Sequence, residues 1–120
     1  MANTICHFEI PAGDLQGASK FYGDLFGWTI APAAEDNPDY LFINTCDKDD
    51  ALGGGLHKPA IEGQGVTVYV KVSSIDATCK KVIELGGAEV TPKTAIASFG
   101  LVAAISDPEG NVIGLFQSEE

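Results

Sequence analysis

The chain has 120 residues and a mass of 12.5 kDa, which fits one ordinary domain and excludes a large multidomain enzyme. Hydrophobic residues make up 45% of it and charged residues 20%, so it has enough apolar side chains to form a core. Seventeen acidic residues against seven basic ones give a net charge of −10, which disfavours nucleic acid and anionic membranes as partners. All seven basic residues are lysines, so no arginine is present to hold a carboxylate or phosphate through two parallel hydrogen bonds.

Cysteine usage and the first residues of the chain indicate a cytoplasmic protein. Cys6, Cys46 and Cys79 are an odd number without CxxC spacing, and their density is far below that of a disulfide scaffold. The first residues show no basic segment followed by an apolar one, and no apolar run reaches the roughly 18 residues that a membrane span needs. We therefore expect a protein of the reducing cytoplasm, without a targeting segment or a membrane span.

The first half of the chain predicts a strand, a helix and three more strands. Residues 5–10 alternate with period two and end at Pro11, as a strand does. Asp14 stands in N-cap position before a helical apolar pattern over 15–26, which Gly27 ends. Short apolar stretches separated by polar, turn-forming residues predict the three further strands, at 28–31, 40–46 and 51–56.

The second half predicts the same order of elements. A polar connector at 58–65 precedes an alternating strand at 66–72. Ser74 is in N-cap position for a helix over 75–85, before two adjacent glycines. Three further strands follow at 88–91, 98–106 and 112–117, with a turn at 107–110.

Residues that begin and end the predicted helices indicate an internal repeat with an offset of 60 residues. Three pairs of landmarks share this offset, namely Asp14 and Ser74, Leu25 and Leu85, and Gly27 and Gly87. We therefore predict an α+β fold in one domain, residues 1–120, built from two βαβββ modules at about 4–57 and 66–118. The modules are expected to form a curved mixed sheet around a cavity, with the helices on the outer face.

Both ends of the chain resemble a known family. HFEIPAGDLQGASKFYGDLFGW at 7–28 and DPEGNVIGLFQ at 107–117 are similar to the ends of a glyoxalase/bleomycin-resistance/dioxygenase domain, of the vicinal oxygen chelate superfamily. The resemblance covers nearly the whole chain and implies the same duplicated fold. It also implies a divalent metal in the curved sheet, held by a ligand from the first and last strand of each module, commonly His and Glu. That metal chelates two neighbouring oxygens of a substrate.

Carried over by position, the resemblance puts the four ligand places at His7, Gly54, Thr67 and Gly114. Only His7 has an ordinary metal-binding side chain, and catalytic zinc typically has three protein ligands. Glu9 lies two positions along the same strand face, but the pair still lacks a third donor. We therefore predict no native metal and no cofactor, while a divalent metal stays possible. The two glycines either open space for a ligand or mark a strand bend.

Strand alternation predicts which side chains line the cavity. His7 and Glu9 share a face opposite Cys6, Phe8 and Ile10. The alternative is that this alternation only reflects a sheet with one buried and one solvent-facing side, without a ligand site. Phe26 and Trp28 are assigned to the core, and His57 to an exposed loop near the mouth of the site. The predicted ligand-binding set is His7, Glu9, Gly54, Thr67, Tyr69, Gly114 and Phe116, and no catalytic residue is assigned.

Three functions remain open on this reading. The favoured one is a family member that binds a small organic ligand in its cavity, with a degenerate metal site. The second is a metal-dependent lyase, isomerase or dioxygenase, in which other residues complete His7 and Glu9. The third is an interaction module without small-molecule chemistry. Glutathione-dependent glyoxalase chemistry is disfavoured, because that substrate has two carboxylates and the chain has no arginine.

A homodimer is expected as well. Each curved sheet has edges and an apolar rim to cover, and members of the family that the chain resembles pair their modules within or between chains.

Overall fold

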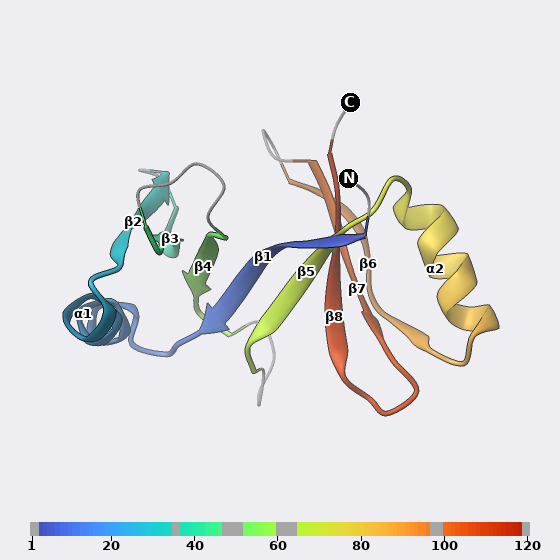
Figure 1. Ribbon diagram of the computed structural model, residues 1–120, viewed down its shortest axis with the longest axis horizontal. Helices are drawn as coiled ribbons and strands as arrows, with labels where there is room; N and C mark the ends of the chain where they lie inside the picture. The colour runs from blue at the N-terminus through green and yellow to red at the C-terminus, as the bar shows by residue number, and fades with distance from the viewer. Residues whose placement is uncertain (1–2, 35–36, 47–51, 60–64, 97–99, 119–120) are drawn as a thin grey trace. The chain divides into compact units, whose positions relative to one another are not determined.

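The computed structural model describes residues 3–34, 37–46, 52–59, 65–96 and 100–118, which form a mixed α+β fold (Figure 1). Its elements repeat the order strand, helix and three strands, so the predicted fold class and the two βαβββ modules are confirmed. None of the helices in these residues is long and apolar enough to cross a bilayer. In chain order the elements are β1 (Thr4–Pro11), α1 (Leu15–Phe26), β2 (Thr29–Ala34), β3 (Asn37–Asn44), β4 (Gly54–His57), β5 (Thr67–Lys71), α2 (Ile75–Glu84), β6 (Ala88–Ile96), β7 (Gly100–Ser106) and β8 (Val112–Gln117).

The chain divides into two compact units with the same strand plan. The first unit holds residues 7–66, and the second holds residues 1–6 and 67–120. In the first unit the strand order is β2-β3-β4-β1, with β1 parallel to β4 and the other pairs antiparallel. In the second unit the order is β5-β8-β7-β6, with β5 parallel to β8 and the other pairs antiparallel. The first and last strands of each module are therefore neighbours.

Both helices begin at a capping side chain, and α1 also ends at a capping glycine. Asp14 accepts a hydrogen bond from Gly17 N–H at 3.0 Å, and Gly27, at φ 76°, ends α1 with its N–H bonded to the Gly23 carbonyl. Ser74 accepts from Ala77 N–H at 3.1 Å at the start of α2. Helix α1 thus has its predicted bounds, whereas α2 ends one residue earlier than predicted.

Each unit has its own hydrophobic core between a helix and one face of its sheet, here termed the helix face. In Figure 1, α1 lies beside the strands of the first unit and α2 beside β6 and β7. Phe8 and Ile10 pack against the core of the first unit, and Val70 packs against that of the second. The buried core residues are Leu15, Leu41, Ile43 and Leu56 in the first unit, and Val72, Ile75, Ala103 and Leu115 in the second.

The predicted offset of 60 residues holds only as far as the helices. After them the equivalent glycines with positive φ are Gly27 and Gly86, and 86 − 27 = 59. The last strands agree with this smaller offset, because Gly55 faces Glu9 on β1 and Gly114 faces Tyr69 on β5. The offset between these glycines is 114 − 55 = 59. The prediction of one offset throughout is therefore wrong by one residue beyond the helices.

Strand β6 is longer than the sequence predicts. It extends through Pro92 to Ile96, whereas the sequence predicts a strand over 88–91. β6 is the last strand in the sheet order, and an edge strand tolerates proline because one side of its backbone has no ladder partner. The register with β7 shifts across Pro92, between Thr91 and Thr94.

Candidate functional site

Two polar side chains of β1 point away from the core of the first unit. His7 and Glu9 alternate with Phe8 and Ile10, and the latter two pack on the helix face. Successive side chains of a strand point to opposite faces, so His7 and Glu9 lie on the other side of the sheet, the opposite face. Their side chains are 29% and 17% exposed and are partly shielded from water. The structure thus places them on one strand face, and their role in ligand binding stays a prediction.

Tyr40, on β3, connects these two side chains. Its hydroxyl donates a hydrogen bond to Glu9 Oε2 at 2.8 Å and lies 2.9 Å from His7 Nε2. A phenol has one proton to donate, and here that proton is directed at the carboxylate. The hydroxyl oxygen therefore accepts from His7 Nε2–H. The order of donation runs from His7 to Tyr40 to Glu9.

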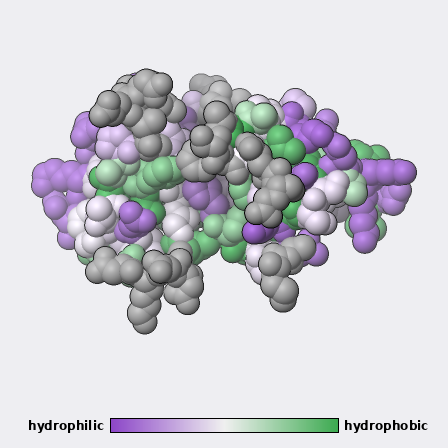
Figure 2. All heavy atoms as spheres, turned by 90° about the horizontal axis from the view of Figure 1, so that it is seen from above, coloured by the Kyte–Doolittle hydropathy of each residue, from purple (hydrophilic) through white to green (hydrophobic). Residues whose placement is uncertain are grey.

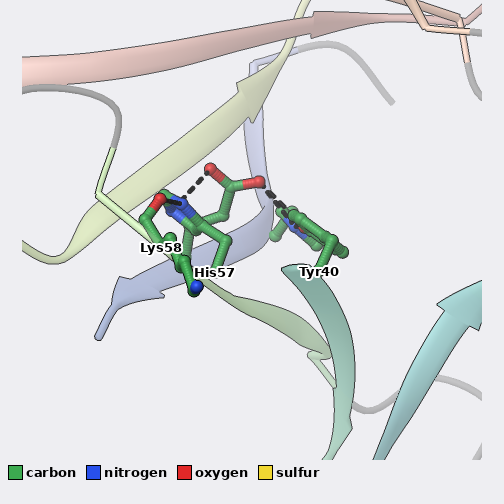
Figure 3. Close-up of polar contacts among 5 residues, drawn as sticks. Tyr40, His57 and Lys58 are labelled. Carbon is green, nitrogen blue, oxygen red and sulfur yellow. Dashed lines mark hydrogen bonds and ion pairs between the residues drawn. The ribbon is translucent and has the colours of Figure 1, made fainter. Parts of the chain in front are cut away.

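His57, at the end of β4, approaches the same carboxylate from another side (Figure 3). Its Nε2 lies 3.5 Å from Glu9 Oε1, and its side chain is 13% exposed. Its ring stacks on that of Tyr40, with centroids 6.0 Å apart and planes 11° from parallel. The prediction that His57 is exposed in a loop is therefore wrong, because β4 extends to this residue and turns its ring inward.

The proton of neutral His57 has a defined position. Nδ1 lies 2.7 Å from the Lys58 carbonyl oxygen, which can only accept, so Nδ1 carries the proton. Nε2 is then a lone-pair acceptor in the neutral ring. This atom is buried and has no hydrogen-bond partner among the described residues. Two acceptors, His57 Nε2 and Glu9 Oε1, consequently face each other.

Gly54 does not share this face, although the sequence placed a ligand position there. It faces Phe8 in the β1–β4 register, and a Cβ added to Gly54 would come within 2.6 Å of the Phe8 ring. The residue that faces Glu9 is Gly55. Three consecutive glycines carry no alternation of side chains, so sequence alone could not set the register of this strand.

The glycines of the opposite face do not leave open space. A Cβ on Gly55 would overlap the Tyr40 hydroxyl, and a Cβ on Gly114 would overlap the Tyr69 ring. In each unit, therefore, a tyrosine occupies the place beside the glycine. For Gly114 the first of the two interpretations, open space for a ligand, is wrong for this reason.

The opposite face of the second unit carries the remaining predicted residues. Thr67 is buried, and Tyr69 and Lys71 share its strand phase, since Val70 and Val72 belong to the helix-face core. Phe116 faces Lys71 in the β5–β8 register. The structure thus groups Thr67, Tyr69, Gly114 and Phe116 within one unit, and His7 and Glu9 within the other. A cavity that combines both groups stays a prediction.

The metal implied by the family resemblance does not fit these residues. With the corrected register the four ligand places are His7, Gly55, Thr67 and Gly114, and tyrosines fill the places beside both glycines. Among the described residues, no group of three or more His, Cys, Asp or Glu side chains is arranged to hold a metal ion. A catalytic zinc site typically requires three protein ligands.

Sequence reasoning missed Tyr40 and misplaced Phe26, as it did His57. Tyr40 was recognised only as part of a strand, yet it alternates with buried Leu41, which would have assigned it to the opposite face. Trp28 packs against the core as predicted. Phe26 contacts Trp28 at 4.8 Å between ring centroids but remains 56% exposed, so its assignment to the core is wrong.

Comparison with known proteins agrees with this architecture. The family described as "Bleomycin resistance protein-like N-terminal" matches residues 4–45. A glyoxylase-like domain-containing protein of Didymella fabae is 30% identical over 93 residues, which are 72% of this chain and 71% of that protein. The chain belongs to the glyoxalase/bleomycin-resistance superfamily.

Other proteins that the chain resembles are less similar in sequence, and some are longer. The putative glyoxylase CFP32 of Mycobacterium tuberculosis is 28% identical, and the match covers 92% of this chain but only 44% of that protein. Methylmalonyl-CoA epimerase of M. tuberculosis has the same fold, with a TM-score of 0.69 at 19% identity, covering 99% of this chain and 90% of that one. A superfamily member from Vibrio splendidus 12B01 superposes with a TM-score of 0.66 at 15% identity, covering 97% and 99%.

Proposed function

We propose that this superfamily member binds a small organic molecule on the opposite face of its first unit, through hydrogen bonds and without a metal. The observation that carries the proposal is the buried Nε2 of His57, which has no hydrogen-bond partner among the described residues and faces Glu9. A buried polar atom without a partner costs free energy, so such an atom persists where a ligand or another function compensates for it.

The surroundings of this atom are typical of a small-molecule site. Such sites combine apolar and aromatic walls with a few polar groups that fix the orientation of the ligand. Here the aromatic walls are Tyr40, stacked on His57, and Phe42, edge-on to Tyr40 at 5.8 Å. The polar groups are the carboxylate of Glu9 and the two imidazoles. The bonds through Tyr40 fix the carboxylate before any ligand arrives, which reduces the entropy lost on binding.

Binding of ligands can be tested by a thermal-shift screen, because a molecule that binds only the native state raises the apparent stability. We expect hits among small organic molecules with and without added divalent metals alike. Each hit should disappear in Glu9→Gln and persist in Glu84→Gln, which removes the same charge from an exposed position on α2. Hits that survive Glu9→Gln and His57→Phe would locate the binding site elsewhere. A screen without hits would favour the interaction module.

The metal-dependent alternative has its own test. His57 is the additional donor that such an enzyme would need beside His7 and Glu9, but these three are not arranged around a common ion. We expect protein purified without chelator to contain far less than one equivalent of zinc, nickel, manganese or iron. Elemental analysis that gives near-stoichiometric metal, lost on His7→Ala, would contradict the proposal and favour the enzyme.

We also propose a homodimer in the cytoplasm. Hydrophobic residues reach the surface among hydrophilic ones (Figure 2), and Phe21, Leu25 and Phe26 on α1 are each more than half exposed. Exposed apolar patches of this kind are typical of interaction surfaces. Sedimentation that shows only a 12.5 kDa species at micromolar concentration would contradict the dimer.

A further inference from the structure

Two hydrogen-bond acceptors that face each other in the first unit, Glu9 Oε1 and His57 Nε2, favour one chemical class of ligand. We infer that the site takes an organic amine in its protonated form, whose ammonium group bridges Glu9 Oε1 and His57 Nε2. The inference rests on the proposed function, which it narrows from a small molecule to a cation. Its evidence is the tautomer of His57, the distance between the two acceptors, and the charge and aromatic character of the surroundings.

The hydrogen-bond roles exclude most other head groups. His57 Nδ1 donates to the Lys58 carbonyl, which leaves Nε2 as an acceptor, and a carboxylate can only accept. A ligand carboxylate or phosphate would bring a third acceptor to this point. A hydroxyl group that donates its single O–H to His57 Nε2 brings the lone pairs of its own oxygen close to the carboxylate. An ammonium group has two or three N–H donors and no lone pair, so it can donate to both atoms.

The distance between the acceptors suits a single nitrogen. Glu9 Oε1 and His57 Nε2 lie 3.5 Å apart. Both can therefore lie at a normal N–H···O or N–H···N length, about 2.9 Å, from one donor nitrogen placed to one side of the line that joins them. A bond from a charged donor to a carboxylate is stronger than one between neutral groups.

Charge and aromatic contacts agree with a cation. The net charge of −10 raises the local concentration of cations around the protein. The nearby cation Lys58 is directed elsewhere, since its Nζ lies 3.8 Å from Asp39 Oδ1. Tyr40 places an aromatic ring beside the carboxylate, with Phe42 edge-on to it at 5.8 Å, and aromatic faces attract ammonium groups.

The first test measures the tautomer in the ligand-free protein. The chain has only two histidines, so His57→Phe and His7→Ala assign their imidazole NMR signals without ambiguity. At pH 8 we expect His57 protonated at Nδ1, which lies 2.7 Å from the Lys58 carbonyl oxygen, and unprotonated at Nε2. Protonation of Nε2 under these conditions would mean that His57 itself donates to Glu9. That result would overturn the inference.

The second test compares three probes that share one ring, namely benzylamine, benzyl alcohol and benzoate. We expect benzylamine to shift the His57 signals in a saturable manner, the alcohol to bind at least about tenfold more weakly, and benzoate not to bind. Glu9→Gln should weaken benzylamine roughly 10- to 100-fold, the loss expected for one bond to a charged group, whereas Glu84→Gln should not change it.

Two variants at residue 57 test the inference separately, so that a folding defect of Glu9→Gln does not decide the outcome. His57→Phe retains a ring against Tyr40 and introduces the residue type that stands at the equivalent position, Phe116. It should abolish binding of benzylamine, and His57→Gln, which restores an acceptor, should recover part of it. Benzylamine binding unaffected by these changes, or alcohol or benzoate binding as tightly, would overturn the inference.

The NMR experiments give one result if only the inference is wrong and another if the proposed function is wrong as well. If neutral or anionic fragments from a diverse library shift the His7 and His57 signals while amines do not, the small-molecule site stands and the cation preference falls. If no fragment of any charge shifts these signals, both fall.

Discussion

The two units share one order of strands and helices, but the side chains on the opposite face of the sheet differ in polarity between them. In the first unit this face carries two imidazoles, a carboxylate and a phenol. At the equivalent positions of the second unit, the register places mostly apolar or aromatic side chains. The equivalent pairs are His7 and Thr67, Glu9 and Tyr69, Tyr40 and Val102, and His57 and Phe116.

This difference shows which features of the repeat the fold needs and which it does not. The core leucines Leu56 and Leu115 and the glycines Gly55 and Gly114 are the same in both units. They decide packing and strand register. Among the described residues, the cluster of polar side chains is found in the first unit alone, although both backbones could present it. A structural requirement would act on both units equally, so the asymmetry favours a functional role for the cluster of the first unit.

The largest expected effect on stability comes from substitutions of the core leucines, which both units share. Leu56→Ala and Leu115→Ala each remove a buried side chain from a separate core and should lower the free energy of unfolding by roughly 2–5 kcal/mol. The double variant should show nearly additive losses, because the two residues share no packing partner. Urea unfolding measures all three. A loss well below 1 kcal/mol for only one leucine would contradict the matching of the two cores.

The glycines sharpen the comparison, since the same substitution should have different functional effects. Gly55→Ala and Gly114→Ala both force a tyrosine to move and should each cost about 1–3 kcal/mol of stability. Only Gly55→Ala displaces the Tyr40 hydroxyl, so only it should shift the imidazole NMR signals of His7 and His57. Gly13→Ala is the control, because a Cβ there meets nothing within 4 Å. Imidazole shifts in Gly54→Ala that equal or exceed those in Gly55→Ala would contradict the register.

Thiol reactivity should also differ between the units. Burial raises the pKa of the Cys79 thiol on α2, and the charges of Glu89 and Asp76 raise it further. Burial likewise raises the pKa of Cys6, against an opposing effect of Lys71. Less thiolate is then present near neutral pH, and the thiolate is the reactive form. We expect iodoacetamide to modify exposed Cys46 of the first unit several-fold faster. Peptide mapping that finds Cys79 modified first would contradict this order.

The smallest effect concerns the turn at 107–110, which the sequence predicted. Asp107 accepts from the backbone N–H groups of Glu109 and Asn111, both at 2.9 Å, and from the Asn111 side chain. These bonds, that of the Asn111 side chain first, lower the pKa of Asp107. The carboxylate therefore stabilises the fold above its unfolded pKa of about 3.9, and this contribution is lost as pH falls through the lower folded value.

Asp107→Ala should accordingly give a small decrease in Tm at pH 7 that vanishes in strong acid. Thermal unfolding at both pH values measures the difference. An equal decrease at both pH values would mean that the residue acts through backbone geometry instead of charge.

Sequence patterns predicted the elements of the fold wherever side chains differed from one residue to the next. Asp14 and Ser74 located both helix starts, because each is a capping side chain directly before an apolar pattern. The patterns failed where neighbouring residues were alike. Either Gly86 or Gly87 could be the glycine that follows α2. The three glycines Gly53, Gly54 and Gly55 show no alternation of side chains, so the face to which each position of β4 points could not be predicted. The error of one residue in the offset follows from these two runs.

The candidate site was predicted in part for the same physical reason. His7 and Glu9 alternate with apolar neighbours and could be placed on a face. His57 stands before Lys58 and Pro59, which resemble a loop, and only the β1–β4 and β3–β4 pairing shows that the strand reaches it. Tyr40 lies 31 residues from Glu9 along the chain, and no local pattern records that contact.

The boundary between the two units falls inside β1, between Cys6 and His7. Residues 1–6 belong with the second unit, where the Asn3 N–H donates to the Lys71 carbonyl, and the rest of the strand belongs with the first. A chain cut in the connector would therefore yield two fragments of similar length, of which only the N-terminal one holds the whole of β1. The C-terminal fragment would lack a segment of its own sheet, which the N-terminal fragment would retain. In a split-protein reporter the N-terminal fragment would thus supply a missing strand segment to its counterpart, and reassembly would proceed by strand complementation.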